Sequence, residues 1–186
     1  MQMRVYEKDN ERKLYFTKKK GKERFFSRKI FLIASILIVV FAGVYTFVKM
    51  SASLEAKAAG FAKNKKVQLI SIGNKGSLGD IQIEQIRING NKTPEYAKIQ
   101  VSNDKKGFLL GDFTSEETKG YTFKNLQSVK LQPHTGPDEQ LERLNKGKES
   151  DQIYALSLAD NISIQEVTIS YRHLGISHQE TISTGL

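Results

Sequence analysis

The distribution of apolar residues divides the chain into two parts with different periodicities. One uninterrupted apolar run covers residues 30–48 and contains neither a charge nor a proline. From Val67 onward the apolar residues occur in short runs, often at every second position, separated by turn segments such as "GNKGSLGD" and "SNDKKG". A long apolar run is typical of a membrane helix, whereas alternation is typical of β-strands.

The run at residues 30–48 predicts a transmembrane helix. A helix needs about 20 mostly apolar residues to cross a bilayer, and this run is rich in Ile, Leu, Val and Phe. A helix in a soluble core would have a polar face, which this segment lacks. A cleavable signal peptide is the alternative, because residues 51–53 (SAS) and 56–58 (AKA) carry the small side chains that a signal peptidase requires. We favour the uncleaved anchor because the apolar run and the segment before it are long.

Basic residues before this helix predict its orientation. Residues 1–29 contain 11 Lys and Arg against 4 Asp and Glu, which is most of the net charge of +9. Positive charge is retained on the cytoplasmic side, so we expect a single-pass cell-membrane protein with a cytoplasmic amino terminus. This tail has too few apolar residues to bury a core. We expect it to rest on anionic lipid headgroups rather than to bind nucleic acid.

Residues 49–66 are expected to form a stalk or linker, helical for most of its length. The segment is rich in Ala and Lys, and Leu54, Ala58 and Phe61 follow one another at helical spacing. Gly60 would interrupt this helix near its end. The stalk would separate the membrane helix from an extracytoplasmic domain of residues 67–186.

The domain of residues 67–186 is predicted to be mainly β. Ile81 and Ile83 alternate with polar residues, as do Ile86 and Ile88, and the change of phase at Glu84-Gln85 predicts a bulge. Further short apolar runs begin near residues 67, 97, 108, 120, 128, 153, 162 and 167. Only residues 137–148 are predicted to be helical, since Pro137 suits a first turn and acidic residues precede basic ones.

Many short strands separated by turns predict an antiparallel β-sandwich. We expect an immunoglobulin-like sandwich, with a small open β-barrel as the alternative. The chain has neither cysteine nor tryptophan, so the disulfide and tryptophan of antibody domains are absent. The lack of cysteine also excludes zinc–thiolate sites, cysteine nucleophiles and a lipid-modified cysteine.

Three histidines are the candidates for chemistry. His134 lies in the loop "QPHTGPD" and is expected to be a solvated loop residue. If Leu174-Gly175 forms a two-residue turn, Tyr171 lies opposite His178 and His173 lies opposite Ile176. His173, His178 and Glu180 would then share one strand face, where two imidazoles and a carboxylate could hold a metal ion. A three-residue turn would instead place His178 and Glu180 on the other face. We expect surface histidines instead, and predict no catalytic, cofactor-binding or metal site.

The function predicted from these features is a non-enzymatic interaction module held at a membrane. No G-x-S-x-G, H-E-x-x-H or phosphate-binding glycine motif occurs in the chain. The outer domain is expected to bind a protein or a cell-wall polymer, and an exported domain without disulfides favours a bacterial source. A cell-surface hydrolase and a membrane signal-transducing protein are the alternatives.

Overall fold

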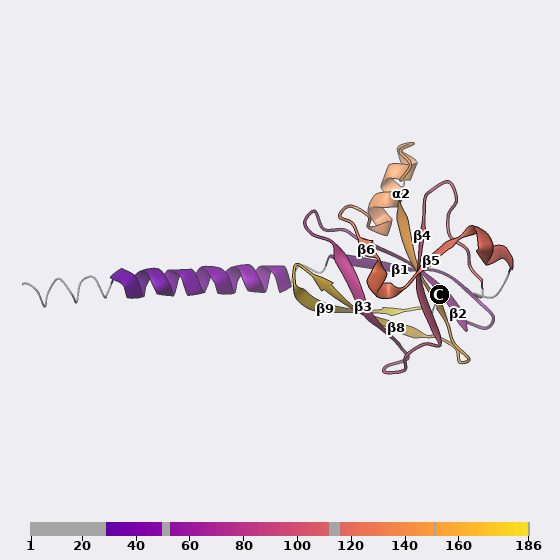
Figure 1. Ribbon diagram of the computed structural model, residues 1–186, viewed down its shortest axis with the longest axis horizontal. Coiled ribbons are helices and arrows are strands. Elements are labelled where there is room, and N and C mark those ends of the chain that lie inside the picture. Colours follow the sequence, from indigo (N-terminus) through magenta and orange to yellow (C-terminus); the bar gives the residue numbers. More distant parts are fainter. Residues whose placement is uncertain (1–28, 50–52, 112–115, 151, 186) are drawn as a thin grey trace, which may run out of the picture. The chain divides into compact units, whose positions relative to one another are not determined.

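The computed structural model describes residues 29–49, 53–111, 116–150 and 152–185. The chain divides into two compact units, Met1–Met50 and Ser51–Leu186. The first contributes one described helix, and the second is a β-rich unit called here the β-domain (Figure 1). The basic tail predicted at residues 1–28 and the part of the linker at residues 50–52 lie outside the described residues.

The apolar helix extends over Lys29–Lys49, and its most apolar stretch of 18 residues has a mean hydropathy of 2.6. Its large apolar side chains are exposed along the whole length from Ile30 to Phe47. Two of its polar side chains are satisfied within the helix. Ser35 Oγ donates to the Phe31 carbonyl at 2.8 Å, and Thr46 Oγ1 donates to the Ala42 carbonyl at 2.9 Å. The prediction of one helix long and apolar enough to cross a membrane is confirmed.

The β-domain contains two antiparallel sheets. Five strands lie in the order β1-β2-β7-β4-β5, and four lie in the order β6-β3-β8-β9 (Figure 1). The strands are β1 Leu54–Ala62, β2 Val67–Asn74, β3 Ile81–Ile88, β4 Tyr96–Ser102, β5 Thr122–Lys124, β6 Lys130–Leu131, β7 Ile153–Ala159, β8 Glu166–His173 and β9 Ile176–Ser183. Neither sheet closes into a barrel among the described residues. The mainly β, antiparallel class is therefore confirmed.

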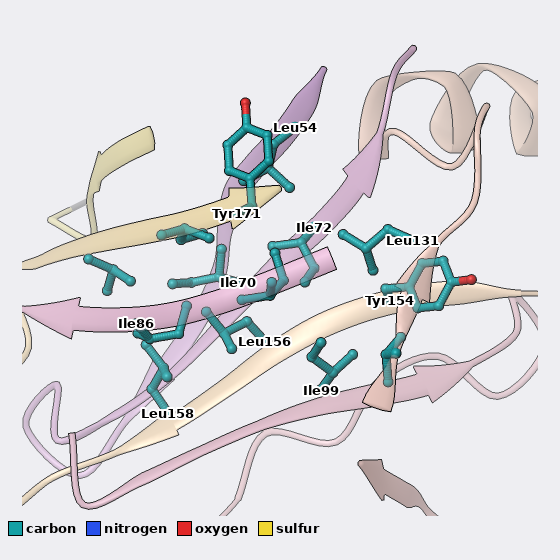
Figure 2. Packing of buried hydrophobic residues seen from close by; sticks show 14 of the residues in the cluster. Leu54, Ile70, Ile72, Ile86, Ile99, Leu131, Tyr154, Leu156, Leu158 and Tyr171 are labelled. Carbon is teal, nitrogen blue, oxygen red and sulfur yellow. The ribbon is translucent and has the colours of Figure 1, made fainter. Parts of the chain in front are cut away.

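Side chains from both sheets form one buried cluster. Ile70 of β2 and Leu156 of β7 come from the five-stranded sheet, while Ile86 of β3 and Tyr171 of β8 come from the four-stranded sheet (Figure 2). β2, β7 and β8 contribute alternate residues to this cluster, because successive side chains of a strand point to opposite faces. This shared core holds the two sheets together.

The bulge predicted in β3 is present. Ile83 pairs with Tyr171 and Gln85 pairs with Ser170, so Glu84 is the additional residue. The shift lets Ile81 and Ile83 before the bulge, and Ile86 and Ile88 after it, all be buried. The two phases of the isoleucine pattern therefore point into one core.

The helical stalk predicted over residues 49–66 is not formed, because Leu54–Ala62 is strand β1. β1 pairs along its length with β2, and seven of the eight β2 residues are buried. β2 needs a neighbour on each edge, and β1 satisfies the edge that β7 leaves open. Three apolar residues on a helical stripe would bury much less, so tertiary pairing overrides helix propensity.

The remaining predicted elements are partly present. α2 extends over Pro137–Asn145, with Pro137 in its first turn and acidic residues at its start, as predicted. Short 3-10 helices η1 Glu116–Gly120 and η2 Leu126–Ser128 flank β5. The apolar runs at residues 108–110 and 162–164 do not form strands. They are loop segments, although Ile164 is completely buried.

Candidate functional site

The last hairpin was the segment that sequence patterning singled out for chemistry. β8 and β9 are joined by the two-residue turn Leu174-Gly175, and Tyr171 pairs with His178 while His173 pairs with Ile176. The predicted register is therefore confirmed. Leu174 has φ 51° and Gly175 has φ 79°, the left-handed values of a type I′ turn.

His173 is buried rather than at the surface as expected, and it is hydrogen-bonded to two other segments. Its Nε2 lies 2.7 Å from the Leu78 carbonyl, to which it donates, and its Nδ1 lies 3.3 Å from Ser53 Oγ. A neutral imidazole protonated on Nε2 accepts from the Ser53 hydroxyl through Nδ1. Both ring nitrogens therefore join other segments to the hairpin: Nδ1 contacts Ser53, the residue before β1, and Nε2 contacts the 77–79 loop.

His178 lies beside this residue but has a different environment. Its ring stacks on Tyr171 with centroids 5.2 Å apart and an interplanar angle of 13°, and lies 6.4 Å from the His173 ring. Burial raises the pKa of the Tyr171 hydroxyl, and the charge of Glu180 acts in the same direction. The hairpin brings these residues together as the spacing predicted. In the described part of the chain, no group of three or more His, Asp or Glu side chains is arranged to hold a metal.

His134 lies in an exposed loop, as predicted, and has φ 61°. Its Nδ1 is 3.3 Å from Glu139 Oε2 in the first turn of α2. Sequence analysis missed this contact, although the two residues are only five apart. Pro137 could have indicated the contact, because a helix that begins there places Glu139 in its first turn, next to the preceding loop.

A depression lies on the outer face of the four-stranded sheet, next to the turn at residues 174–175. Gln82 pairs with Lys130 on one side and with Arg172 on the other, so these three polar residues form a row across β6, β3 and β8. Arg172 also bonds to Glu84 at 2.7 Å. The depression is lined by Gly79, Asp80, Gln82, Lys130, Arg172, Leu174 and Gly175. Its volume of about 290 Å³ is just below the range usual for small-molecule sites.

The opposite end of the β-domain is formed by loops 63–66, 89–95 and 160–165, called here the lysine-turn end. Asp160 holds these loops together. It accepts hydrogen bonds from the Glu95 and Ile162 amides at 3.2 and 3.1 Å and from Lys92 Nζ at 2.5 Å. Burial alone would raise the pKa of Asp160, but these donors outweigh it and the pKa is lowered.

The surface at this end carries exposed apolar side chains. Phe61, Tyr96 and Ile162 are each more than two-fifths exposed, and Lys65 Nζ lies 5.3 Å from the centre of the Phe61 ring. The Asp160 amide bonds to the Lys66 carbonyl at 3.0 Å, which places the 160–165 loop beside the β1–β2 turn. Aromatic side chains next to cationic ones are common in the centres of protein interfaces.

An acidic pair joins α2 to β1. The Glu55 carboxyl shares a hydrogen bond with Asp138, and Lys57 Nζ contacts both, at 3.4 Å from Glu55 and in a shorter ion pair with Asp138. Burial raises the pKa of Glu55, with the Asp138 carboxylate as a further cause. Hydrogen bonds from Lys57 and Glu55 lower the pKa of Asp138. The pair therefore holds a proton on Glu55 more readily than on Asp138.

Replacement of Glu55 by Gln is expected to change how stability depends on pH. A group whose pKa is raised in the folded state takes up a proton on folding, so the β-domain should gain stability as the pH falls from 7 toward the usual pKa of glutamate. Glu55→Gln cannot titrate and should lose this gain. Melting temperatures of both proteins at neutral and mildly acidic pH measure the difference. Glu142→Gln is the matched control, since the lowered pKa of Glu142 affects stability only at lower pH.

No family model, curated protein or solved structure matches this chain.

Proposed function

We propose that this chain is a single-pass membrane protein that displays its β-domain outside the cytoplasm as a non-enzymatic interaction module. The observation that carries the proposal is the helix Lys29–Lys49, whose apolar side chains are exposed on a helix with no polar face. Exposed apolar surface costs about 25 cal/mol per Å² in water, and a bilayer removes that cost. The internally bonded hydroxyls of Ser35 and Thr46 suit the same surroundings.

The orientation follows from charge. The excess of Lys and Arg in residues 1–29 favours a cytoplasmic amino terminus at the cell membrane, with the tail against anionic headgroups. A signal-anchor of this kind leaves residues 51–186 in the extracytoplasmic space. The absence of cysteine from an exported domain favours a bacterial envelope protein.

We further propose that the β-domain is an immunoglobulin-like sandwich. The order β1-β2-β7-β4 corresponds to strands A-B-E-D of a constant-type domain, and β3-β8-β9 corresponds to C-F-G. β5 and β6 are additions at the edges, and they lie in the long connection between β4 and β7 together with α2. Apolar residues, including Ile70 and Ile169, take the place of the inter-sheet disulfide.

The partner surface is assigned to the lysine-turn end. β1 has nine residues and rises about 3.3 Å per residue. The lysine-turn end, at the end of β1, therefore lies far from Leu54, where the strand begins. Exposed Phe61, Tyr96 and Ile162 at that end offer contact area to a protein of the envelope or to a cell-wall polymer. The buried polar side chains His173 and Asp160 serve structural bonds, which favours an interaction role over hydrolysis.

Thiol labelling in intact cells tests the proposed topology. Because the chain has no cysteine, single cysteines can be introduced at Thr17 and at Gln179, an exposed position of β9. A membrane-impermeant reagent should label Gln179→Cys in intact cells and Thr17→Cys only after permeabilisation. The reverse pattern would contradict the orientation, and release of Gln179→Cys into the medium would indicate a cleaved signal peptide.

The same single-cysteine approach tests the partner surface. A photo-crosslinker attached to Ile162→Cys should give a discrete adduct with an envelope protein or polymer, whereas the same reagent on Gln179→Cys should give none. Equal adducts at both positions, or none at Ile162, would contradict the assignment of this surface.

A further inference from the structure

We propose that the loops 77–79 and 174–175, called here the leucine loops, rest on the surface of the bilayer that holds the helix and so orient the β-domain. The inference rests on the proposed function, because it needs the helix Lys29–Lys49 to be in a membrane. It adds a lipid contact made by the β-domain itself.

The two loops lie together, although they are almost 100 residues apart in sequence. The bond from His173 Nε2 to the Leu78 carbonyl joins them. A Cβ atom added to Gly79 would lie only 2.6 Å from Leu174 Cδ2, so the glycine permits this close approach. Leu78 is 70% exposed and Leu174 is 50% exposed. Two leucines are therefore presented to the outside from one small region.

The backbone conformation of Leu174 is unfavourable for leucine. The type I′ turn requires positive φ at both central residues and favours Asn, Asp or Gly at the first. Leucine at φ 51° is strained, because its Cβ crowds the backbone in the left-handed region. Half of this strained side chain remains exposed, and backbone strain is commonly found where a residue serves binding.

Few residues separate the segment bonded to these loops from the apolar helix along the chain. Ser53, which bonds to His173 beside the turn, follows the last helical residue Lys49 by only four positions. Four residues span at most about 14 Å even when fully extended. Ser53 also accepts the Lys75 amide through its carbonyl at 2.8 Å, so the start of the 75–80 loop is tied to the same point.

Charge around the leucine loops suits an anionic lipid surface. Lys130 and Arg172 line the depression that Leu174 also borders, with Asp80 as the acidic residue of that lining. Arg172 is paired with Glu84, so Lys130 supplies most of the positive charge here. Lys75 is exposed at the start of the neighbouring loop. Apolar side chains that enter the headgroup region and basic residues that remain at its surface are the usual elements of peripheral membrane contact.

Tryptophan fluorescence in vesicles tests the inference directly, because the chain contains no tryptophan. Three full-length variants, Leu174→Trp, Phe41→Trp and Ile162→Trp, are reconstituted in vesicles of phosphatidylcholine and phosphatidylglycerol, with and without bromine on the acyl chains. Phe41→Trp, in the helix, should be strongly quenched. Leu174→Trp should show blue-shifted emission and partial quenching, and Ile162→Trp at the lysine-turn end should remain unquenched.

The three reporters separate the possible failures. An unquenched Phe41→Trp would refute the membrane span and with it the proposed function. A quenched Phe41→Trp with red-shifted, unquenched Leu174→Trp would refute the lipid contact alone. Blue-shifted but unquenched Leu174→Trp would also overturn the inference, because it would mean that protein, not lipid, covers the loops.

A second variant keeps the proposal testable if the tryptophan at position 174 perturbs the turn. Leu174→Asn relieves the strain of the type I′ turn, so it should raise the melting temperature of the β-domain. It should at the same time reduce the lipid quenching of a reporter at Leu78→Trp. Unchanged quenching of that reporter in the Leu174→Asn background would contradict a role for Leu174 in lipid contact.

Discussion

Removal of strand β1 is expected to abolish cooperative folding of the β-domain. A chain of residues 67–186 lacks Leu54, which is buried in the core, and exposes the edge of β2 along the whole β1–β2 ladder. Burial of one leucine contributes about 1.5–3 kcal/mol, and each lost ladder hydrogen bond adds roughly 1 kcal/mol. Together these losses are comparable with the whole stability of a domain, about 5–15 kcal/mol.

Circular dichroism and thermal melting of two truncated proteins measure this effect. Residues 53–186 contain the complete β1 and should give a β-type spectrum and a cooperative melt without the membrane helix. Residues 67–186 should give a weak spectrum without a transition, or should aggregate through the exposed β2 edge. Equal melting temperatures for the two proteins would show that β1 is a dispensable attachment and that the domain begins at Val67.

The sequence was informative wherever one strand face is buried and the other is polar. In β3 and β8 this alternation predicted the strands, and the phase change at Glu84-Gln85 predicted the bulge. The register of the last hairpin followed on the condition that Leu174-Gly175 forms a two-residue turn, which the structure has. Pro137 marked the start of α2 for a similarly local reason. Each of these predictions depends on a short stretch of chain and elementary geometry.

β1 could not be predicted in the same way, because its strand conformation depends on pairing with β2. The segment "LEAKAAGFA" has good helix formers, and only the unsatisfied edge of β2 makes it a strand. The candidate sites also depend on contacts between segments that are distant in sequence. Gln82, Lys130 and Arg172 meet only through the register of β6, β3 and β8. The bond from His173 to Leu78 likewise joins segments that no local pattern connects.

Ile169→Ala is expected to be the most destabilising single substitution proposed for the β-domain. Ile169 is completely buried at the middle of β8, where it pairs with Ile86 of β3 on one side and with Glu180 of β9 on the other. β8 is an inner strand of its sheet, so rigid neighbours on both sides prevent the cavity from collapsing. Truncation of a buried isoleucine to alanine costs about 2–5 kcal/mol, and truncation to valine about 0.5–1.5 kcal/mol.

The decrease in melting temperature should therefore be smallest for Ser170→Ala, larger for Ile169→Val and largest for Ile169→Ala. Ser170 is the adjacent residue of β8, points to the other face and is partly exposed, so its substitution should change stability by no more than about 0.5 kcal/mol. For a domain of this size, each kcal/mol lowers the melting temperature by about 3 °C, which gives a fall of roughly 6–15 °C for Ile169→Ala. A fall no larger than that of Ser170→Ala would contradict the burial of Ile169 between the two sheets, and with it the shared core on which the fold depends.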